Sequence, residues 1–490
     1  MPSKLYSRRN IESGASLRWR FGLVLGGMAT IKVAMFGSGW QRHAHVKRGH
    51  GTRSVWPALL ILLVSAEPTH AAQGPSEDAL AQAGIRRLES QRLTLYTDLP
   101  STPAVDQLPA AFDQAYPQWC KYFNVPQQQV PPWHATACLM RDQARFKATG
   151  LLPRDVPAFS HGYTINDRFW LNEQPSDYYR RHLLLHEGTH AFMFTRLGSC
   201  GPTWYMEGMA ELLSTHRWDG EKLLLGYFPK DRDEVPYWGR IKLIEDANAA
   251  GEDLRLERLL PMSPRELGDR LGYAWAWAAA AFMDGHPQYR EQFREAAKFA
   301  RAPDFNRRFE KLFGGAWPEL CAEFAMFVHD IEHGYDFERS QLDWQPGKPL
   351  VAKGSTVTIR ADRGWQNTGI ALKAGETYAL EAQGRFGVDD EPQVWWSEPG
   401  GVTLRYYRGR PLGELQAIVV PPAKIAVKQP PWGSATSIGL AGSITPAQAG
   451  TLFLRVNDSA AELADNQGEL QVKVAPATNT ERAAAAPAGN

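Results

Sequence analysis

The stretch from His182 to His216 constrains this chain most, because it carries two linked groups of ionisable side chains. His186, Glu187 and His190 form an H-E-x-x-H motif. On a helix, positions i and i+4 lie on one face, so both histidines can reach one metal ion. Glu187 would then stand beside the open coordination position. The motif predicts a helix that carries a catalytic zinc site.

A catalytic zinc ion takes three protein ligands and one water, so a third ligand has to come from another element. Glu207 is our candidate, because its distance from His190 leaves room for the first helix to end, a Cys-Gly-Pro turn, and a second helix that crosses the first. Glu187 would accept a proton from the water. Glu211, one turn beyond Glu207, would hydrogen-bond the far nitrogen of a ligand histidine.

A short motif also arises by chance, and the alternative is a core helix whose histidines are ordinary buried side chains. The Glu-Gly-x-x-Glu group at 207–211 argues against coincidence. His182 lies on the same helix face as His186, and we interpret it as structural or as a supporting residue behind the metal. His161 and His216 receive no specific role.

The two motif helices together resemble the gluzincin zinc metallopeptidases, in particular the bacterial peptidase-MA-like proteins. The matching segments are His186-Glu187-x-x-His190 and Trp204-x-x-Glu207-Gly208-x-Ala210-Glu211. The resemblance spans about residues 90–335. It implies a zinc ion held by His186, His190 and Glu207, with Glu187 as the general base.

The same resemblance suggests a role for Tyr273. In the aminopeptidase branch of these enzymes, a tyrosine near a later apolar helix stabilises the oxyanion, and Tyr273 occupies a similar place. A packed core aromatic is the alternative for Tyr273, because its surroundings are so apolar. The Gly-x-Met-Glu-Asn signature of that branch is absent from the sequence, which leaves an endopeptidase or an inactive relative.

Length and composition indicate more than one domain. The 490 residues exceed one ordinary domain, and 43% hydrophobic and 22% charged residues are typical of a soluble globular protein. Lys and Arg are concentrated near the N-terminus, so the remainder is net acidic and nothing favours nucleic acid as a partner. The expected division is a basic leader with a signal peptide at 1–72, a gluzincin-like domain at 75–344, a β-sandwich at 345–476 and a disordered tail at 477–490.

The leader ends in a pattern typical of export signals. Basic residues precede an apolar run, Val55–Ala66, and small residues follow at 69–72. We therefore expect an exported protein, whether periplasmic, secreted or at the cell surface. The alternatives are a membrane anchor at this run or at Phe21–Gly37, and a true start downstream, for example at Met35.

The four cysteines have no C-x-x-C spacing, which argues against a cysteine-rich metal site. In an exported protein they could form two disulfides in three possible connectivities. One such pair, Cys200 with Cys321, would join the motif region to a later helix; the other two are Cys120 and Cys138.

Patterning before the linker indicates an α+β catalytic domain of the zincin type, with a small mixed sheet and helices. We expect strands at 93–96 and 134–140 and a hairpin at 159–171, whose arm nearest the motif forms a sheet edge able to hold an extended peptide. The motif helix should begin at Ser176 or Asp177 and stop at Gly198. Further helices are expected at 75–91, 101–123, 202–215, 267–283, 288–300 and 317–333.

After the linker candidate at 345–349, short alternating runs separated by Gly, Pro and Asn favour an all-β sandwich. The expected strands are 356–360, 378–382, 402–406, 418–420, 425–427, 451–456 and 469–474.

Oxygen ligands suited to calcium are concentrated in one loop of this sandwich. Asn457-Asp458, followed by Asp465-Asn466-Gln467-Gly468, resembles the last hairpin of the calcium-dependent galactose-binding bacterial lectins. The resemblance implies calcium ligands at Asp458, Asp465 and Asn466, with Asp465 replacing an Asn, and glycans as partners. An Asx-rich turn without an ion is the alternative. Trp395 and Trp396 are either a sugar-stacking platform or core aromatics.

The sequence thus leads us to expect an exported zinc metallopeptidase that hydrolyses protein or peptide bonds and is targeted by a glycan-binding C-terminal domain. One alternative is a cell-surface or secreted carbohydrate-binding protein whose metallopeptidase-like domain is an inactive scaffold. Another is a hydrolase of a non-peptide bond, because a zinc site does not name its substrate.

Overall fold

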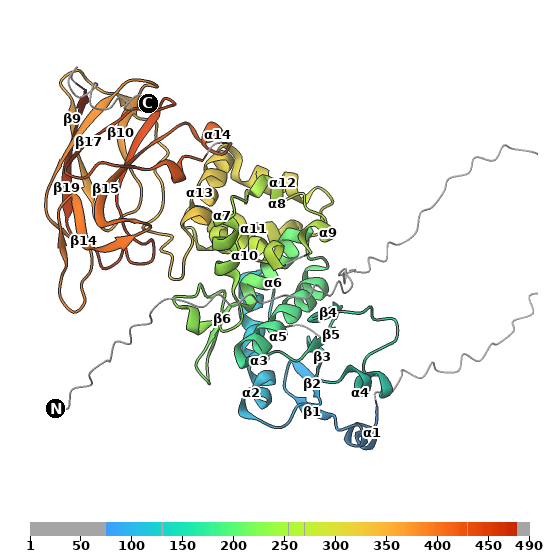
Figure 1. Cartoon of the computed structure of the whole chain (residues 1–490). Coiled ribbons are helices and arrows are strands. Elements are labelled where there is room, and N and C mark those ends of the chain that lie inside the picture. The colour runs from blue at the N-terminus through green and yellow to red at the C-terminus, as the bar shows by residue number, and fades with distance from the viewer. Residues whose placement is uncertain (1–74, 129–131, 253, 269, 429, 478–490) are drawn as a thin grey trace, which may run out of the picture.

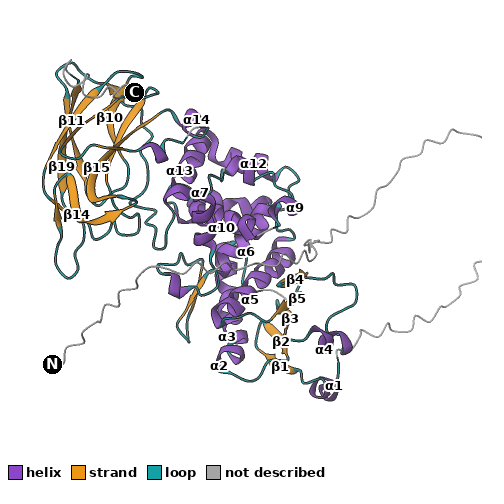
Figure 2. Cartoon of the chain, viewed as in Figure 1, coloured by secondary structure: helices purple, strands orange, loops and turns teal. Residues whose placement is uncertain are grey.

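The computed structural model describes residues 75–128, 132–252, 254–268, 270–428 and 430–477 (Figure 1). The expected leader at 1–72 lies outside these residues, as does the expected tail beyond Ala477. Helices and a small sheet make up the N-terminal part, and a β-rich region follows it (Figure 2). Within the described ranges, no helix has both the length and the apolar character needed to span a membrane.

The small mixed sheet has the order β1-β2-β3-β5-β4. Strands β2, β3 and β5 run parallel, whereas β1 and β4 pair antiparallel to their neighbours. The expected hairpin is confirmed: Asn166, at φ 54°, turns the chain between β4 and β5. Its first arm, β4, is the edge. The strands are β1 Arg86–Glu89, β2 Leu93–Thr97, β3 Ala135–Met140, β4 Gly162–Ile165 and β5 Arg168–Asn172.

One expected helix, 75–91, is only half correct. The helix α1 (Glu77–Gln82) ends early, because Gly84 at φ 65° turns the chain into β1. Alternate side chains of β1 are more exposed, as an edge strand requires. The expected helix at 101–123 is divided into α2 (Pro103–Asp106) and α3 (Leu108–Tyr122).

The motif helix α5 (Asp177–Phe192) begins and ends as expected. The hydroxyl of Ser176 accepts a hydrogen bond from the Tyr179 amide at 3.0 Å, which caps its first turn. A π-helical turn over Met193–Leu197 extends it to Gly198, whose φ of 75° ends it. The next helix, α6 (Thr203–Ser214), follows Pro202.

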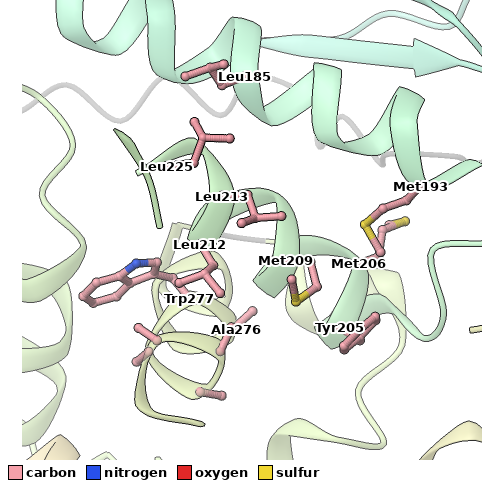
Figure 3. Packing of buried hydrophobic residues seen from close by; sticks show 14 of the residues in the cluster. Leu185, Met193, Tyr205, Met206, Met209, Leu212, Leu213, Leu225, Ala276 and Trp277 are labelled. Carbon is pink, nitrogen blue, oxygen red and sulfur yellow. The ribbon is translucent and has the colours of Figure 1, made fainter. Parts of the chain in front are cut away.

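The helices from α7 to α13 build a second layer, in which α10 packs most extensively on α6, whereas α4 lies beside β3 of the small sheet. Figure 3 shows Leu212 of α6 beside Trp277 of α10, and Leu185 of α5 belongs to the same apolar core. A small hairpin, β6 (His216–Trp218) with β7 (Leu223–Leu225), follows α6. The helices are α4 Gln143–Ala148, α7 Arg240–Ala249, α8 Leu256–Leu259, α9 Pro264–Leu267, α10 Arg270–Gly285, α11 Arg290–Glu295, α12 Phe305–Phe313 and α13 Trp317–Asp330.

The C-terminal region contains two larger sheets that enclose one apolar core. One has the order β14-β15-β18-β10-β8 with β16 beside β15, and the other has the order β17-β11-β19-β9. The strands are β8 Lys348–Pro349, β9 Ser355–Arg360, β10 Gln366–Leu372, β11 Tyr378–Gln383, β12 Phe386–Gly387, β13 Trp396–Ser397, β14 Gly400–Tyr407, β15 Arg410–Val420, β16 Thr436–Ser437, β17 Ala441–Ile444, β18 Gly450–Val456 and β19 Glu469–Pro476.

The expected strand at 425–427 is wrong. Those residues lie in and just after a short helix, α14 (Ala423–Ala426), with Pro422 at its N-cap. Two consecutive prolines at 421 and 422 have no amide hydrogen for a strand ladder, and their restricted φ suits the start of a helix. The strand expected at 418–420 is the end of the longer β15.

The structure contains neither of the two disulfides that the cysteine count left possible. All four cysteines are free and buried. They lie on α3, on β3, just before α6 and on α13, each packed in apolar surroundings. Burial raises the pKa of the Cys138 thiol to about 12, which keeps it protonated and unreactive.

Ionic and hydrogen-bonded contacts join the β-rich region to the end of α13. The carboxylate of Asp330 pairs with Arg408 and Arg455 of the β-rich region. Glu332 accepts hydrogen bonds from the Tyr407 hydroxyl at 3.1 Å and the Ser459 hydroxyl at 2.7 Å. These contacts dock the two parts against each other.

Candidate metal centre

The two motif histidines face the same point from one side of α5. Their rings lie 4.8 Å apart at nearly a right angle, and their Nε2 atoms are 3.2 Å apart. Both rings are buried. The i, i+4 spacing on an unbroken helix produces this arrangement, as the sequence predicts.

The structure brings Glu207 to the same point from α6. Its Oε2 lies 3.4 Å from Nε2 of His186 and 3.4 Å from Nε2 of His190. Zinc binds nitrogen and oxygen at about 2.0–2.2 Å, so neighbouring ligand atoms of a tetrahedral site are separated by about 3.3–3.6 Å. The three atoms therefore form a triangle with the size of one face of a zinc tetrahedron.

Close packing of α6 on α10 positions Glu207. A Cβ on Gly208 would approach the backbone oxygen of Ala276 to 2.8 Å, so the absence of a side chain allows the two helices to touch. This explains in physical terms why a glycine follows the candidate ligand.

Two polar atoms of the centre are buried and have no hydrogen-bond partner among the described residues: Nδ1 of His190 and Oε2 of Glu207. A buried acceptor without a donor is costly unless something else satisfies it. Oε2 of Glu207 is one corner of the triangle, so a cation there would satisfy it.

The charge balance also fits a cation. Three carboxylates, Glu187, Glu207 and Glu211, face the histidine pair, and one guanidinium, Arg240, compensates one of them. Burial opposes the ionisation of His186, but Glu207, Glu211 and Glu187 outweigh it and raise the pKa of His186 to about 9. Burial likewise opposes the ionisation of Glu207, but the two histidines lower its pKa to about 2. The centre attracts positive charge, which a divalent ion supplies.

Behind the centre, Glu211 holds two histidines. Its Oε1 lies 3.5 Å from Nδ1 of His186, the far nitrogen of a candidate ligand, and its Oε2 lies 3.4 Å from Nε2 of His182. The other nitrogen of His182 lies 3.0 Å from the Ser214 backbone oxygen. His182 therefore buttresses Glu211 and is held in the core, which agrees with its interpretation as a supporting residue.

Arg240 of α7 completes this support, and the sequence reasoning missed it. Its Nη2 and Nε donate to the two oxygens of Glu211 at 2.8 and 3.1 Å, and both residues are buried. Burial opposes the ionisation of Glu211, yet Arg240 and His182 lower the pKa of Glu211 well below its usual range. A basic residue at the start of an amphipathic helix gives no signal that it will reach a carboxylate 29 positions earlier.

The carboxylate of Glu187 lies between the metal centre and the edge strand β4. The Thr164 hydroxyl donates to its Oε2 at 2.6 Å. Gly162 lies even closer, since a Cβ there would stand 2.3 Å from Oε1 of Glu187. Strand β4 thus both holds the Glu187 carboxylate and leaves room for it. Neither Thr164 nor Gly162 was singled out from the sequence.

The structure places Tyr273, in the first turn of α10, beside the centre. Its ring lies 6.4 Å from the ring of His186, and it is only partly buried. Burial and the charges of Glu207, Glu187 and Glu211 raise the pKa of its hydroxyl well above the usual value. The hydroxyl therefore remains a proton donor at neutral pH.

The candidate calcium residues lie together in the loop before β19. Nδ2 of Asn466 donates to Oδ2 of Asp458 at 2.7 Å, while Oδ1 of Asn466 and Oδ1 of Asp465 are buried without a hydrogen-bond partner among the described residues. Oxygens of Asp389, Asp390 and Asp465 lie within 4.8 Å of one another. The sequence did not indicate the two aspartates of the β12–β13 hairpin.

The paired tryptophans divide between the two interpretations. Trp395 packs against the core of the β-rich region, whereas Trp396 is 48% exposed and lies 5.3 Å from the Arg385 guanidinium. Trp395 lies just before β13, and Trp396 is its exposed first residue.

Comparison with known proteins adds little. No protein-family model and no curated protein matches this chain. One similar solved structure is described as "EclA N-terminal domain; PllA-like lectin": it is 25% identical, the match covers 25% of this chain and 95% of that chain, and the TM-score is 0.20.

Proposed function

We propose that this protein is a zinc-dependent metallopeptidase of the gluzincin type that hydrolyses protein or peptide bonds. The observation that carries the proposal is the triangle of His186 Nε2, His190 Nε2 and Glu207 Oε2, with sides of 3.2, 3.4 and 3.4 Å. A core helix with ordinary buried histidines has no need for a carboxylate oxygen without a donor at this point.

His186, His190 and Glu207 would hold the ion, which would polarise the scissile carbonyl and acidify the attacking water. Glu187 accepts the proton of that water and passes it to the leaving amine. The Thr164 hydroxyl holds the Glu187 carboxylate in place. The Tyr273 hydroxyl, kept protonated by its raised pKa, donates a hydrogen bond to the oxyanion that develops at the carbonyl.

The edge strand supports a peptide as the substrate. β4 is paired on one side only, with β5, and its first residue lies against Glu187. An extended peptide can add to such an edge through backbone hydrogen bonds. A peptide so bound would run past the base and the metal ligands.

For the β-rich region we propose calcium and glycan binding through Asp458, Asp465 and Asn466. The support is the pair of buried oxygens without hydrogen-bond partners among the described residues, on Asp465 and Asn466, and the two carboxylates of Asp389 and Asp390 that lie beside Asp465. Oxygen atoms of this kind suit calcium.

We also propose that the protein is exported, to the periplasm, the medium or the cell surface. Detection of the full-length chain only in the cytoplasm would contradict this.

Digestion of a peptide library tests the catalytic proposal. We expect the zinc-loaded protein to cleave peptides, a chelator to abolish cleavage, and Glu187→Gln to reduce kcat by about 10²–10⁴-fold. Elemental analysis should find close to one zinc per chain in both. Glu310→Gln, which changes an exposed glutamate on α12, is the matched control.

Two results would contradict the proposal: a Glu187→Gln protein as fast as the wild type, or far less than one zinc per chain after loading. Glycan binding that persists in His190→Ala, combined with no proteolysis by the wild type, would favour the alternative of a carbohydrate-binding protein with an inactive scaffold.

A further inference from the structure

A cavity of about 310 Å³ lies beside α10. Small-molecule sites have volumes of about 300–1,000 Å³, so this cavity is large enough for a small ligand. Its wall combines apolar and charged side chains, among them Leu212, Phe228, Trp277, Phe337, Asp284 and Arg290.

The cavity is separate from the metal centre but shares its helices. Trp277, Ala281 and Asp284 line it, and they follow Tyr273 at intervals of four, four and three residues, so all four lie along one face of α10. At 1.5 Å per residue, Ala281 stands about 12 Å along the helix from Tyr273. Trp277 lies between the two sites, next to Leu212 of α6 (Figure 3).

Three aromatic rings form an apolar wall. The ring of Phe228 stacks on Trp277 at 5.5 Å and meets Phe337 edge-on at 5.2 Å. Leu212 and Ala281 extend the same wall. Such a wall accepts an aromatic ring or a short alkyl chain.

The charged side of the cavity carries a positive charge, on Arg290, that no carboxylate in the described part of the chain pairs with. The carboxylate of Asp284 is already paired with Arg294, at 2.7 and 3.1 Å, and bonded by the Tyr122 hydroxyl at 3.0 Å. Arg290 donates through Nε and Nη2 to the backbone oxygens of Asp284 and Gly285, at the end of α10. Among the described residues, no carboxylate forms an ion pair with Arg290, and its Nη1 has no acceptor.

We propose that this cavity binds a small amphipathic carboxylate. Its apolar body would lie against Phe228, Trp277 and Phe337, and its carboxylate would face Nη1 of Arg290. The bonds of Arg290 to the end of α10 hold the guanidinium in place before a ligand arrives, which lowers the entropic cost of binding. The ligand would contact α6 one residue beyond Glu211, so the site is placed to influence the metal centre.

Isothermal titration calorimetry on the full-length protein tests this, with 4-phenylbutyrate as the anionic probe and 4-phenylbutanol as its neutral counterpart. We expect 4-phenylbutyrate to bind with a Kd on the order of 0.1–1 mM, the range that a ligand of this size reaches. Binding of the alcohol should be at least tenfold weaker. The measurement does not depend on peptidase activity. A failure of the cavity proposal can therefore be distinguished from a failure of the proposed function.

Two variants locate the binding. Arg290→Gln should weaken 4-phenylbutyrate by at least tenfold and change the alcohol less than threefold, whereas Arg307→Gln, at an exposed arginine on α12, should change neither. Ala281→Phe fills the cavity and should abolish both.

Equal binding of acid and alcohol by the wild type, no binding of either at 10 mM, or unchanged binding in Ala281→Phe would each overturn the proposal. The comparison of acid and alcohol needs no variant, so it decides the matter even if a substitution prevents folding.

Discussion

Arg240 and Glu211 form a bidentate ion pair inside the core, in which Nη2 and Nε of the arginine lie 2.8 and 3.1 Å from the two carboxylate oxygens. Glu211 in turn lies 3.5 Å from Nδ1 of His186. The ring orientation of a candidate metal ligand therefore depends on a residue of α7 that touches no metal ligand directly.

Arg240→Lys tests this dependence. A lysine keeps the charge but lacks the planar fork, so Glu211 loses one of its two bonds and its orientation. Substituting a residue that orients a metal ligand reduces metal affinity or activity by about 10–100-fold. We expect losses of that size in both zinc affinity and kcat/KM. Competition with a zinc chelator measures the first and peptide hydrolysis the second.

The control for Arg240→Lys is Arg308→Lys, at an exposed arginine paired with Asp304. If both variants kept the zinc affinity of the wild type, Arg240 would have no role in positioning His186.

Gly162→Ala should separate catalysis from metal binding. The new Cβ would stand 2.3 Å from Oε1 of Glu187, so the carboxylate has to move. A displaced general base costs about 100-fold in kcat/KM, because proton transfer requires hydrogen-bonding distance. Zinc content should remain at one per chain, since the metal ligands are untouched.

Gly315→Ala is the matched control for Gly162→Ala, because nothing lies within 4 Å of its added Cβ. Full activity of Gly162→Ala would show that Glu187 does not act from the position seen in this structure.

Tyr273→Phe removes one hydroxyl and leaves the ring. Loss of one oxyanion donor costs about 10²–10³-fold in rate, so kcat should fall by that factor while KM and zinc content change little. Because the pKa of Tyr273 is raised well above its usual value, its ionisation should not limit activity below pH 10. A change confined to KM would assign Tyr273 to substrate binding. Tyr237→Phe, at an exposed tyrosine, is the control.

Asp458→Asn should change the pH dependence of stability. Burial raises the pKa of Asp458 to about 7, whereas an unfolded aspartate titrates near 3.9. The folded state therefore binds more protons between about pH 4 and 7, and stability falls as the pH rises through that window, by about 1.4 kcal/mol per pH unit at most. Asparagine does not ionise, so the variant avoids the free-energy cost of burying a charged carboxylate. Its Tm should exceed that of the wild type at pH 8 but not at pH 4.

Added calcium should reverse the difference in Tm between the wild type and Asp458→Asn at pH 8. If Asp458 binds the ion, added calcium raises the Tm of the wild type at pH 8 and leaves that of Asp458→Asn unchanged. The control is Asp155→Asn, at an exposed aspartate. Equal responses of wild type and Asp458→Asn would remove Asp458 from the proposed calcium site.

Much of the fold near the centre follows from local signals in the sequence. Ser176 caps α5 and Gly198 ends its π-helical extension, as capping preferences predict. The hairpin turn was predictable from the turn signal at Asn166 and Asp167. Which arm forms the edge was decided by the strand order of the sheet, in which β4 is outermost. The strand expected at 425–427 was wrong because neighbouring prolines outweighed its apolar pattern.

Long-range partners could not be predicted. Export and an even number of cysteines left two disulfides possible, but pairing requires that two Cβ atoms lie about 3.5–4.5 Å apart, which no sequence spacing reveals. Arg240 with Glu211 and Asp389 with Asp465 likewise meet only because separate elements pack together.

The sequence by itself determined that His186 and His190 share a helix face with Glu187 beside them, because the helical repeat places i and i+4 together. Only the tertiary structure decided that Glu207 lies 3.4 Å from both Nε2 atoms, that Arg240 holds the carboxylate behind them, and that Gly162 makes room for Glu187. The physical reason is that the packing of α5, α6, α7 and β4 sets these distances, and packing depends on side-chain volumes across the whole core.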